Sequence, residues 1–357
     1  MKIHGIVLLL VGCGSSAVDT GRDAAVVTRD AAARDAIAVV HDDAAARDAL
    51  VSADAAPADD AAPMNPDASP AFAFLVTESP PGAPTVASWR GVLQYTATTP
   101  GAPLIPVPGI ASARLADPAG LAFRRTSSEV FVGNRHGNNS GDGVAGSICR
   151  FRYDSVTRTF TGTGTITGNG LDGVHQLAFD PISGDLFAAN VRAGVSRFSF
   201  DAAGNAVAAG TLASGPIRGV LVSPDGHRLF ATTAGDVIRV FDLTNAGAEL
   251  PSFTVAGGAN LHYLALRSGE VYVAGLDLNR VYRLTLSAAS ELALRDSFPA
   301  DSPIGIAFSP DGREMIVAGH RASDVIQRYD YDAALDTWAP GAIINTTASL
   351  GGLMIIP

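Results

Sequence analysis

Five short segments of this chain repeat one another at a nearly constant spacing, and this repetition restricts the fold more than any other feature. Each segment has four residues of mostly apolar character, and the last residues of successive segments lie 56, 43, 44 and 42 residues apart. A period of this length, with about four short strands in each unit, is typical of a β-propeller. The segments are Gly120–Phe123, Gln176–Phe179, Gly219–Val222, Tyr263–Leu266 and Gly305–Phe308.

The residues after each segment indicate a turn and two further strands. Ser223–Gly226 and Ser309–Gly312 both read Ser-Pro-Asp-Gly. They predict tight turns, because proline presets φ at the first corner and glycine accepts the positive φ of a hairpin. A second apolar strand follows each turn, as in Leu229–Ala231. The third strand alternates apolar and polar residues, as in Val237–Phe241 and Arg280–Leu284, which is the period expected of a strand.

The two ends of the repeating region supply the number of units. Phe72–Val76 has the pattern of a second strand with no first strand before it, and Gly352–Ile356 has that of a first strand with nothing after it. Pairing the two would complete a sixth unit and close the ring without a long exposed edge. We therefore predict an all-β, six-bladed propeller over residues 71–357, closed by the C-terminal strand. A seventh blade would need a repeat unit that the sequence does not show.

The repeats resemble the YVTN-repeat and lactonase-like propeller proteins, most plainly in Gly219–Leu243 and Ile306–Gly319. The resemblance covers residues 71–357 and implies, for a lactonase-like relative, hydrolase or isomerase chemistry. The chain departs from this pattern in two respects: its first two blades are irregular, and lactonase-like relatives usually have seven blades. These departures leave the activity open.

The N-terminus has the features of an export signal. Lys2 precedes the apolar run Ile6–Val11, which is shorter than the roughly 20 residues that a membrane-spanning helix needs. Leu10–Cys13 reads Leu-Val-Gly-Cys and resembles the lipobox of bacterial lipoproteins. The resemblance implies a signal peptide over 1–12, cleavage before Cys13 and lipid attachment to its thiol and new amino group. An ordinary secretory signal with a chance cysteine is the alternative.

If Cys13 is lipidated, the protein is exported and anchored in the cell envelope. Gly14 after the cysteine, by the family's sorting rule, favours the outer membrane and leaves open which face of it carries the protein. Residues 19–70 contain 18 alanines, 11 aspartates and no aromatic residue. Such a segment cannot bury enough apolar surface to offset the entropy of ordering. We therefore predict a disordered tether over residues 13–70; a transient helix over 29–50 is the alternative.

The charge of the chain restricts its partners. The net charge is −10, of which residues 19–70 carry −7 and the predicted propeller only −4. The propeller therefore has no basic field that would attract nucleic acid. We expect a monomer that meets the membrane only through its lipid anchor, with a protein or glycan as its ligand.

One face of the predicted ring gathers the candidate functional residues. In an up-and-down meander, the loops before the first strands and after the second strands meet on the same face, where propellers place function. Three successive blades bring His175, Arg218 and His262 to the start of their first strands. The loops after the second strands add further ligand-binding candidates, which are Glu78, Asn134, His136, Asn190, Arg192 and His320.

These residues favour two different functions. Imidazoles beside Arg218 suit an anionic or carbonyl-bearing ligand, or a metal completed by Glu78 or Asp172. No His-Glu-x-x-His spacing supports a metal, so we predict no cofactor, with a divalent cation as the alternative. No nucleophile elbow and no dinucleotide-binding glycine motif is present either. We therefore favour a non-enzymatic, membrane-tethered binding module that recognises a protein, peptide or glycan.

The alternative is a lactonase-like hydrolase or isomerase. It would use His175, Arg218 and His262 at the mouth of the channel, with Glu78 as the acid–base partner. An enzyme requires a concave pocket in which these groups converge, whereas a binding module can use a broader rim.

Overall fold

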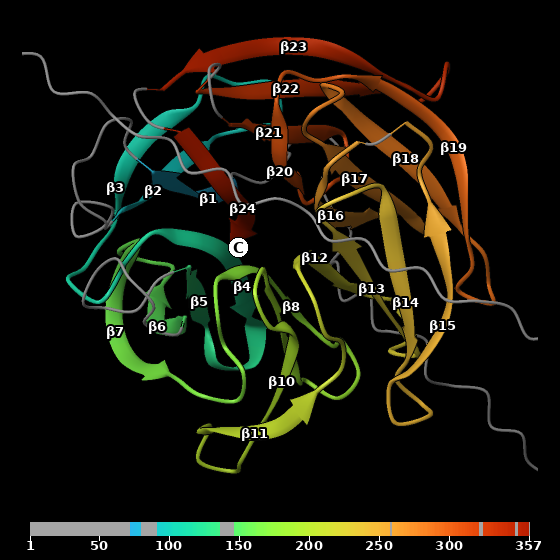
Figure 1. Ribbon diagram of the computed structural model, residues 1–357. Coiled ribbons are helices and arrows are strands. Elements are labelled where there is room, and N and C mark those ends of the chain that lie inside the picture. The colour runs from blue at the N-terminus through green and yellow to red at the C-terminus, as the bar shows by residue number, and fades with distance from the viewer. Residues whose placement is uncertain are drawn as a thin grey trace, which may run out of the picture. The chain divides into compact units, whose positions relative to one another are not determined.

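The computed structural model describes residues 72–79, 91–135, 146–257, 259–320, 324–346 and 349–356. These residues form six four-stranded antiparallel sheets arranged around a central axis (Figure 1). The fold is therefore an all-β propeller with six blades, as the repeats predicted. The described residues contain no helical segment with the length and apolar character that crossing a bilayer requires. The signal peptide and the tether lie outside the described residues and stay predictions.

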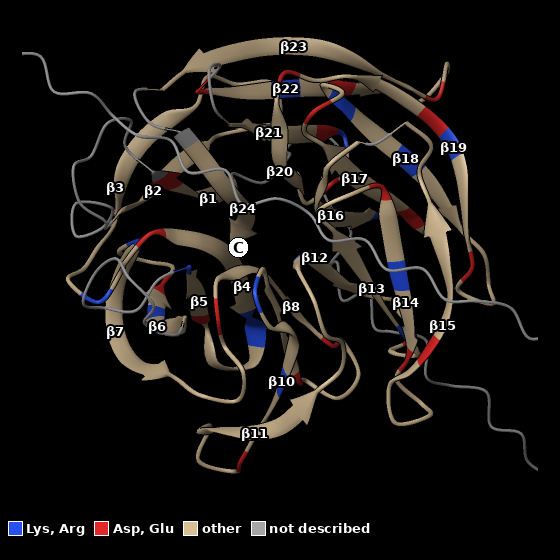
Figure 2. Ribbon diagram, viewed as in Figure 1, with Lys and Arg blue, Asp and Glu red and all other residues tan. Residues whose placement is uncertain are grey.

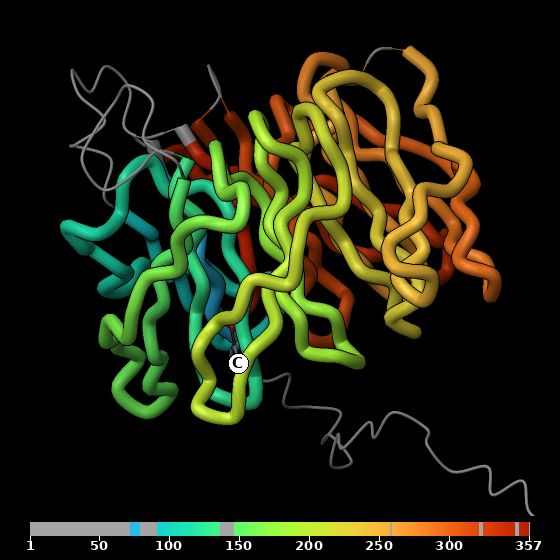
Figure 3. Tube along the Cα trace, turned by 60° about the horizontal axis from the view of Figure 1, so that its bottom comes forward, coloured from blue at the N-terminus to red at the C-terminus, as the bar shows by residue number. Residues whose placement is uncertain are grey.

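Each blade runs from an inner strand at the axis to an outer strand at the rim (Figure 1). Figure 3 shows the same blades turned by 60° about the horizontal axis. A short 3₁₀ helix, Arg125–Ser127, follows the inner strand of blade 2. From the axis outward the strands are β24 (Ser349–Ile356), β1 (Phe72–Ser79), β2 (Gly91–Ala97) and β3 (Ile105–Ala111) in blade 1; β4 (Pro118–Arg124), β5 (Glu129–Asn134), β6 (Ser147–Asp154) and β7 (Thr159–Ile166) in blade 2; β8 (Val174–Phe179), β9 (Leu186–Asn190), β10 (Gly194–Phe200) and β11 (Ala206–Thr211) in blade 3; β12 (Ile217–Val222), β13 (Arg228–Thr233), β14 (Val237–Asp242) and β15 (Ala248–Thr254) in blade 4; β16 (Leu261–Arg267), β17 (Glu270–Gly275), β18 (Arg280–Leu286) and β19 (Leu292–Pro299) in blade 5; and β20 (Pro303–Phe308), β21 (Glu314–Gly319), β22 (Val325–Asp332) and β23 (Thr337–Asn345) in blade 6.

The ring closes through pairing of the two ends of the described chain. Strand β24 lies antiparallel to β1, with Ala73 opposite Ile356 and Val76 opposite Leu353. Leu350, Leu353 and Ile356 are buried between neighbouring blades. The C-terminal strand therefore supplies the inner strand of blade 1, as the sequence predicted.

The hydrophobic core lies between the faces of adjacent blades. Every residue of β5, β9, β17 and β21 is buried, because a second strand has its own sheet on both sides and a neighbouring blade on each face. Phe131 and Phe187 illustrate this packing and are fully buried. At about 25 cal/mol per Å² of apolar area, burial of these strands is a main source of stability. It also explains why they read as continuous apolar runs.

Charged pairs recur at the same place in several blades. In four blades an acidic residue at or just before the start of the second strand pairs with an arginine on the third strand, as in Glu129–Arg150 at 2.8 Å and Asp185–Arg197 at 2.7 Å. The other two pairs are Glu270–Arg283 and Glu314–Arg328. Acidic and basic residues are correspondingly interspersed around the ring (Figure 2).

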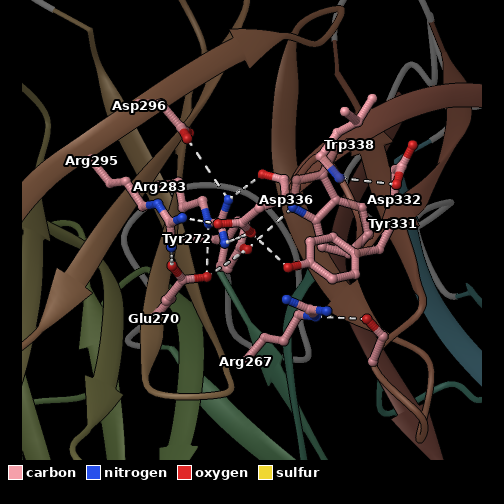
Figure 4. Close-up of polar contacts among 12 residues, drawn as sticks. Arg267, Glu270, Tyr272, Arg283, Arg295, Asp296, Tyr331, Asp332, Asp336 and Trp338 are labelled. Carbon is pink, nitrogen blue, oxygen red and sulfur yellow. Dashed lines mark hydrogen bonds and ion pairs between the residues drawn. The ribbon is translucent and has the colours of Figure 1, made fainter.

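In blade 5 this pair grows into a network that reaches blade 6. Arg283 donates from Nε to Glu270 at 2.7 Å and from Nη2 to Asp336 of blade 6 at 2.6 Å (Figure 4). Burial alone would raise the pKa of Glu270, but the hydrogen bonds from Arg283 and Arg295 outweigh it and lower that pKa. Arg283 thus joins two blades through charged hydrogen bonds.

Candidate functional site

The inner strands approach one another closely at the first position of the repeated segment. Glycine occupies this position in several blades because no side chain would fit: a Cβ on Gly120 would lie 1.6 Å from the carbonyl oxygen of His175, and one on Gly219 would lie 2.4 Å from that of His262. Blades 3 and 5 instead carry Gln176 and Tyr263 at this position. These two side chains therefore fill the space around the axis.

Gln176 bridges three blades. Its Oε1 accepts hydrogen bonds from the backbone N–H of Val220 at 3.1 Å and of Leu264 at 2.9 Å. Its Nε2 donates to the carbonyl oxygen of Leu264 at 2.6 Å. The side chain thus pairs with main-chain groups of blades 4 and 5 from its place on β8 of blade 3.

Next to Gln176, four side chains gather at the axis; we name His175, Arg218, His262 and Tyr263 the axial cluster. The ring centroids of His175 and His262 lie 6.3 Å apart, and that of Tyr263 lies 6.2 Å from His175. Nη1 of Arg218 donates to the Nε2 of His262 and, at 2.7 Å, to the side-chain oxygen of Asn260. Because arginine can only donate, the Nε2 of His262 carries no proton here. The three residues predicted to meet at the channel mouth therefore do converge.

A small cavity adjoins this cluster, and we name it the axial cavity. Arg135, His175, Tyr263 and His320 line it together with residues of blades 1, 2 and 6. It measures about 10 Å³, which is the space of about one water molecule. The Nδ1 of His320 lies 3.0 Å from the carbonyl oxygen of Leu350 and therefore carries a proton. The structure thus brings His320 to the site as well.

Burial sets the charge state of these groups. It lowers the pKa of His175 well below 6.5, and the positive charges of Arg135 and Arg218 lower it further. Burial also raises the pKa of the Tyr263 hydroxyl. At neutral pH the cavity wall therefore presents a neutral imidazole and a protonated phenol.

Two of the predicted ligand-binding residues are instead enclosed within single blades. Asn134 and Asn190 end the second strands β5 and β9 and are fully buried. The side-chain oxygen of Asn134 accepts from the N–H of Ala116, and that of Asn190 accepts from the N–H of Asp172. Their amide groups donate to carbonyl and hydroxyl oxygens of their own blade or of the loop that enters it. Both asparagines therefore hold loops in place through buried hydrogen bonds.

The remaining predicted residues contact other parts of the domain or lie outside the described range. Arg192 pairs with Asp172 at 2.8 Å, and both side chains are exposed. Glu78 lies against Gly91 of β2 in blade 1, where burial raises the pKa of its carboxyl group. His136 and Cys13 are not among the described residues. Within the described ranges, no group of three or more His, Cys, Asp or Glu side chains could hold a metal ion.

Comparison with known proteins shows similarity at the level of the fold. No protein family matches the sequence. No characterised protein matches it by sequence either. The fold resembles the periplasmic gluconolactonase PpgL of Pseudomonas aeruginosa, with a TM-score of 0.57 and 17% identity over 77% of this chain and 83% of that one.

Two further solved structures are similar in fold. A Bacteroides uniformis protein provisionally named a 6-phosphogluconolactonase gives a TM-score of 0.59, with 17% identity over 77% of this chain and 83% of that one. A chain of a nidogen/laminin complex gives 0.56, with 12% identity over 80% of this chain and 98% of that one. Propellers of this shape therefore include a lactonase and a component of a protein complex, so the fold does not choose between these functions.

Sequence reasoning missed Tyr263 and Gln176, although both lie inside the repeated segments that identified the fold. The available signal was the first position of each segment, where Gly120, Gly219 and Gly305 contrast with these two large polar residues. A polar residue at a position that otherwise requires glycine has to point into the centre of the ring. That contrast would have placed both residues at the axis.

Proposed function

We propose that this protein is a binding module, tethered in the cell envelope by a lipid on Cys13. It recognises its partner on the face that carries the loops before the inner strands, which we name the loop-rich face. The observation that carries the proposal is where the chain enters the domain. Ala73 pairs with Ile356 at the end of β24, so the chain enters on the face opposite to the loops that precede the inner strands. A tether attached there leaves the loop-rich face open to a partner.

The charges near the axial cavity favour a partner with acidic groups. Arg135 and Arg218 are permanent cations that both act on His175. Asp117 pairs with Arg135, and Arg218 donates to Asn260 and His262. The neutral His175 imidazole adds a hydrogen-bonding group without a negative charge. A carboxylate of a peptide or glycan would match this arrangement.

Binding of defined probes to two arginine variants tests the proposal. The probes are polyglutamate and polygalacturonate, which are acidic, and dextran, which is neutral. We expect the purified propeller to bind an acidic probe but not dextran, and Arg218→Gln to weaken this binding at least tenfold. Arg239→Gln is the matched control, since Arg239 pairs with Glu249 away from the axis. Absence of binding to both acidic probes, or equal binding by both variants, would contradict the proposal.

A lactonase-like hydrolase is the second candidate, favoured by the contact between Arg218 and His262 and by the fold shared with PpgL. Sites for small molecules usually occupy about 300–1,000 Å³, whereas the axial cavity measures about 10 Å³. Hydrolysis of gluconolactone decides between the candidates. A rate above that of buffer that disappears in His262→Ala would establish the enzyme; a rate equal to that of buffer supports the binding module.

A further inference from the structure

A pocket opens between blades 2 and 3 on the face opposite to the loop-rich face. The residues that line it belong to the ends of β4 and β8 and to the turns that follow these inner strands, and are Phe123–Thr126 and Phe179–Gly184. Inner strands begin at the loop-rich face, so the turns after them lie on the face where the chain enters. The pocket has a volume of about 550 Å³, within the range of about 300–1,000 Å³ that small-molecule sites usually occupy. We name it the interblade pocket.

Much of the wall of the interblade pocket is apolar. Phe123, Phe179, Pro181 and Ile182 contribute to it. Phe179 is held in place by an edge-on contact with Phe131, with ring centroids 5.1 Å apart. Ile182 is 71% exposed, so water reaches this part of the wall. A ligand with an apolar body would therefore gain free energy by covering it.

Two arginines add positive charge to the apolar wall. Arg124 and Arg125 line the pocket, and within the described ranges neither guanidinium group has an ion-pair or hydrogen-bond partner. The guanidinium of Arg124 lies over the Phe200 ring, 4.1 Å from its centroid. This stacking covers one flat side of the guanidinium and leaves the N–H groups at its edge for a ligand.

The acidic side chain in the pocket is already hydrogen-bonded. Asp180 accepts from the backbone N–H of Ile182 at 2.8 Å and from the hydroxyl group of Ser183 at 2.7 Å. Its carboxylate therefore stabilises its own turn and has no ion pair with either arginine. Two arginines and one aspartate among the lining residues leave an excess of one positive charge.

The equivalent arginine of blade 5 has a hydrogen-bond acceptor that Arg124 lacks. Arg124 and Arg267 both directly follow the repeated segment of their blade. Arg267 lies over the Tyr331 ring, 3.9 Å from its centroid, and its Nε donates to the carbonyl oxygen of Gly312 at 2.6 Å. Gly312 belongs to the turn of the next blade. Beside Arg124, the turn of the next blade borders the interblade pocket instead, which leaves room for the acceptor of a ligand.

We propose that the interblade pocket binds a small amphiphilic carboxylate, with its apolar or aromatic body against Phe179 and Ile182 and its carboxylate on Arg124. The planar guanidinium matches the two oxygens of a carboxylate. One excess positive charge suits a monoanion better than a doubly charged phosphate. The site goes beyond the proposed function, because it lies on the opposite face and shares no residue with the axial cluster.

Titration calorimetry of the unaltered protein with three probes tests the ligand class. Naphthylacetate has both the aromatic body and the charge, naphthylacetamide is its neutral analogue, and acetate has the charge without the ring. We expect naphthylacetate to bind at least tenfold more tightly than either of the other two. Equal affinities for the acid and its amide, or absence of naphthylacetate binding, would overturn the proposal.

Two pairs of variants test the place of binding. Arg124→Gln should weaken naphthylacetate binding at least tenfold and leave naphthylacetamide binding nearly unchanged. Arg313→Gln is its matched control, since Arg313 is exposed in the turn after the inner strand of blade 6. Ile182→Ser should also weaken naphthylacetate binding, whereas Leu335→Ser should not. Both aliphatic side chains are 71% exposed, and Leu335 lies in the hairpin between β22 and β23 of blade 6.

Equal affinities within both pairs of variants would contradict the assignment of the site. None of these substitutions alters a residue of the axial cluster, and the probes differ from those for the partner. This site can therefore fail while the proposed function stands.

Discussion

At the scale of single residues, packing at the centre of the propeller depends on which residue stands at the first position of each repeated segment. Where the inner strands touch, Gly120 and Gly219 allow backbones to approach closer than a Cβ permits. Gln176 stands at the same position in blade 3 and fills the space with its side-chain amide. That amide donates to the carbonyl oxygen of Leu264 and accepts from the N–H of the same residue. Gln176 in blade 3 and Tyr263 in blade 5 therefore fill the centre of the ring, which glycine at the same position would leave open.

Gln176→Met tests this bridging role, since methionine has a similar size and cannot form the same hydrogen bonds. The backbone groups of Val220 and Leu264 would lose a partner, and leaving buried polar groups unpaired costs about 1–3 kcal/mol. We expect the free energy of unfolding in urea to fall by this amount. A change below about 0.5 kcal/mol, the range of ordinary surface substitutions, would show that the bridge does not contribute to stability.

His175 should make the stability depend on pH. Its folded pKa lies well below 6.5, so below pH 6.5 the unfolded chain binds a proton that the folded protein does not. Stability therefore falls as the pH falls through this range, by at most about 1.4 kcal/mol per pH unit for one group. Urea unfolding at pH 7.5, 6.5 and 5.5 should show this slope.

His175→Asn should reduce the slope by the contribution of one proton. His227→Asn is the control for the loss of an imidazole, because His227 is exposed and lies in the hairpin between β12 and β13. Identical slopes in all three proteins would mean that His175 does not contribute to acid destabilisation.

At the scale of elements, the acid–arginine pairs connect strands within a blade and, in blade 5, connect two blades. Arg283 is 3% exposed and its partner Glu270 is 10% exposed, so water would solvate neither charge well if the other were removed. Arg239–Glu249 is a contrasting pair at the rim, with exposures of 20% and 46%. The two pairs have similar geometry, but we expect the buried pair to contribute more to the free energy of unfolding than the exposed pair.

Arg283→Met and Arg239→Met form a matched comparison. Removing one partner of a buried pair costs about 3–5 kcal/mol, and Arg295, which also contacts Glu270, places the expected loss for Arg283→Met near the lower end. The exposed pair should contribute about 0.2–1 kcal/mol. Chemical unfolding measures the loss of unfolding free energy in both variants. Equal losses would refute the expected difference between the buried and the exposed pair.

At the scale of the whole molecule, stability depends on one strand that joins the two ends of the described chain. Strand β24 pairs with β1 and contacts the inner strands of blades 2 and 6. Without it, blade 1 would expose the edge of β1 and the apolar faces of its neighbours. Exposed edges of this kind promote aggregation.

Deletion of residues 350–357 should abolish cooperative thermal unfolding or cause aggregation during size-exclusion chromatography. Point substitutions provide a milder comparison. Leu353→Asp in β24 places a charge at a position that is 8% exposed, whereas Ile343→Asp in the outer strand β23 alters a side chain that is 64% exposed. We expect only the first to unfold at a much lower temperature. Parent-like melting of the truncated protein would contradict closure by β24.

The sequence by itself determined the propeller, its six blades and its closure, because strand pattern and repeat spacing are local properties that any blade carries. It also brought His175, Arg218 and His262 to one place, since their equivalent positions in successive blades must meet around an axis. Only the tertiary structure decided that Asn134 and Asn190 are enclosed in their own blades. It also decided that the Glu78 side chain lies against Gly91 of β2 and that Tyr263 and Gln176 fill the centre. These outcomes depend on side-chain direction and on contacts between residues far apart in the chain, which no single repeat encodes.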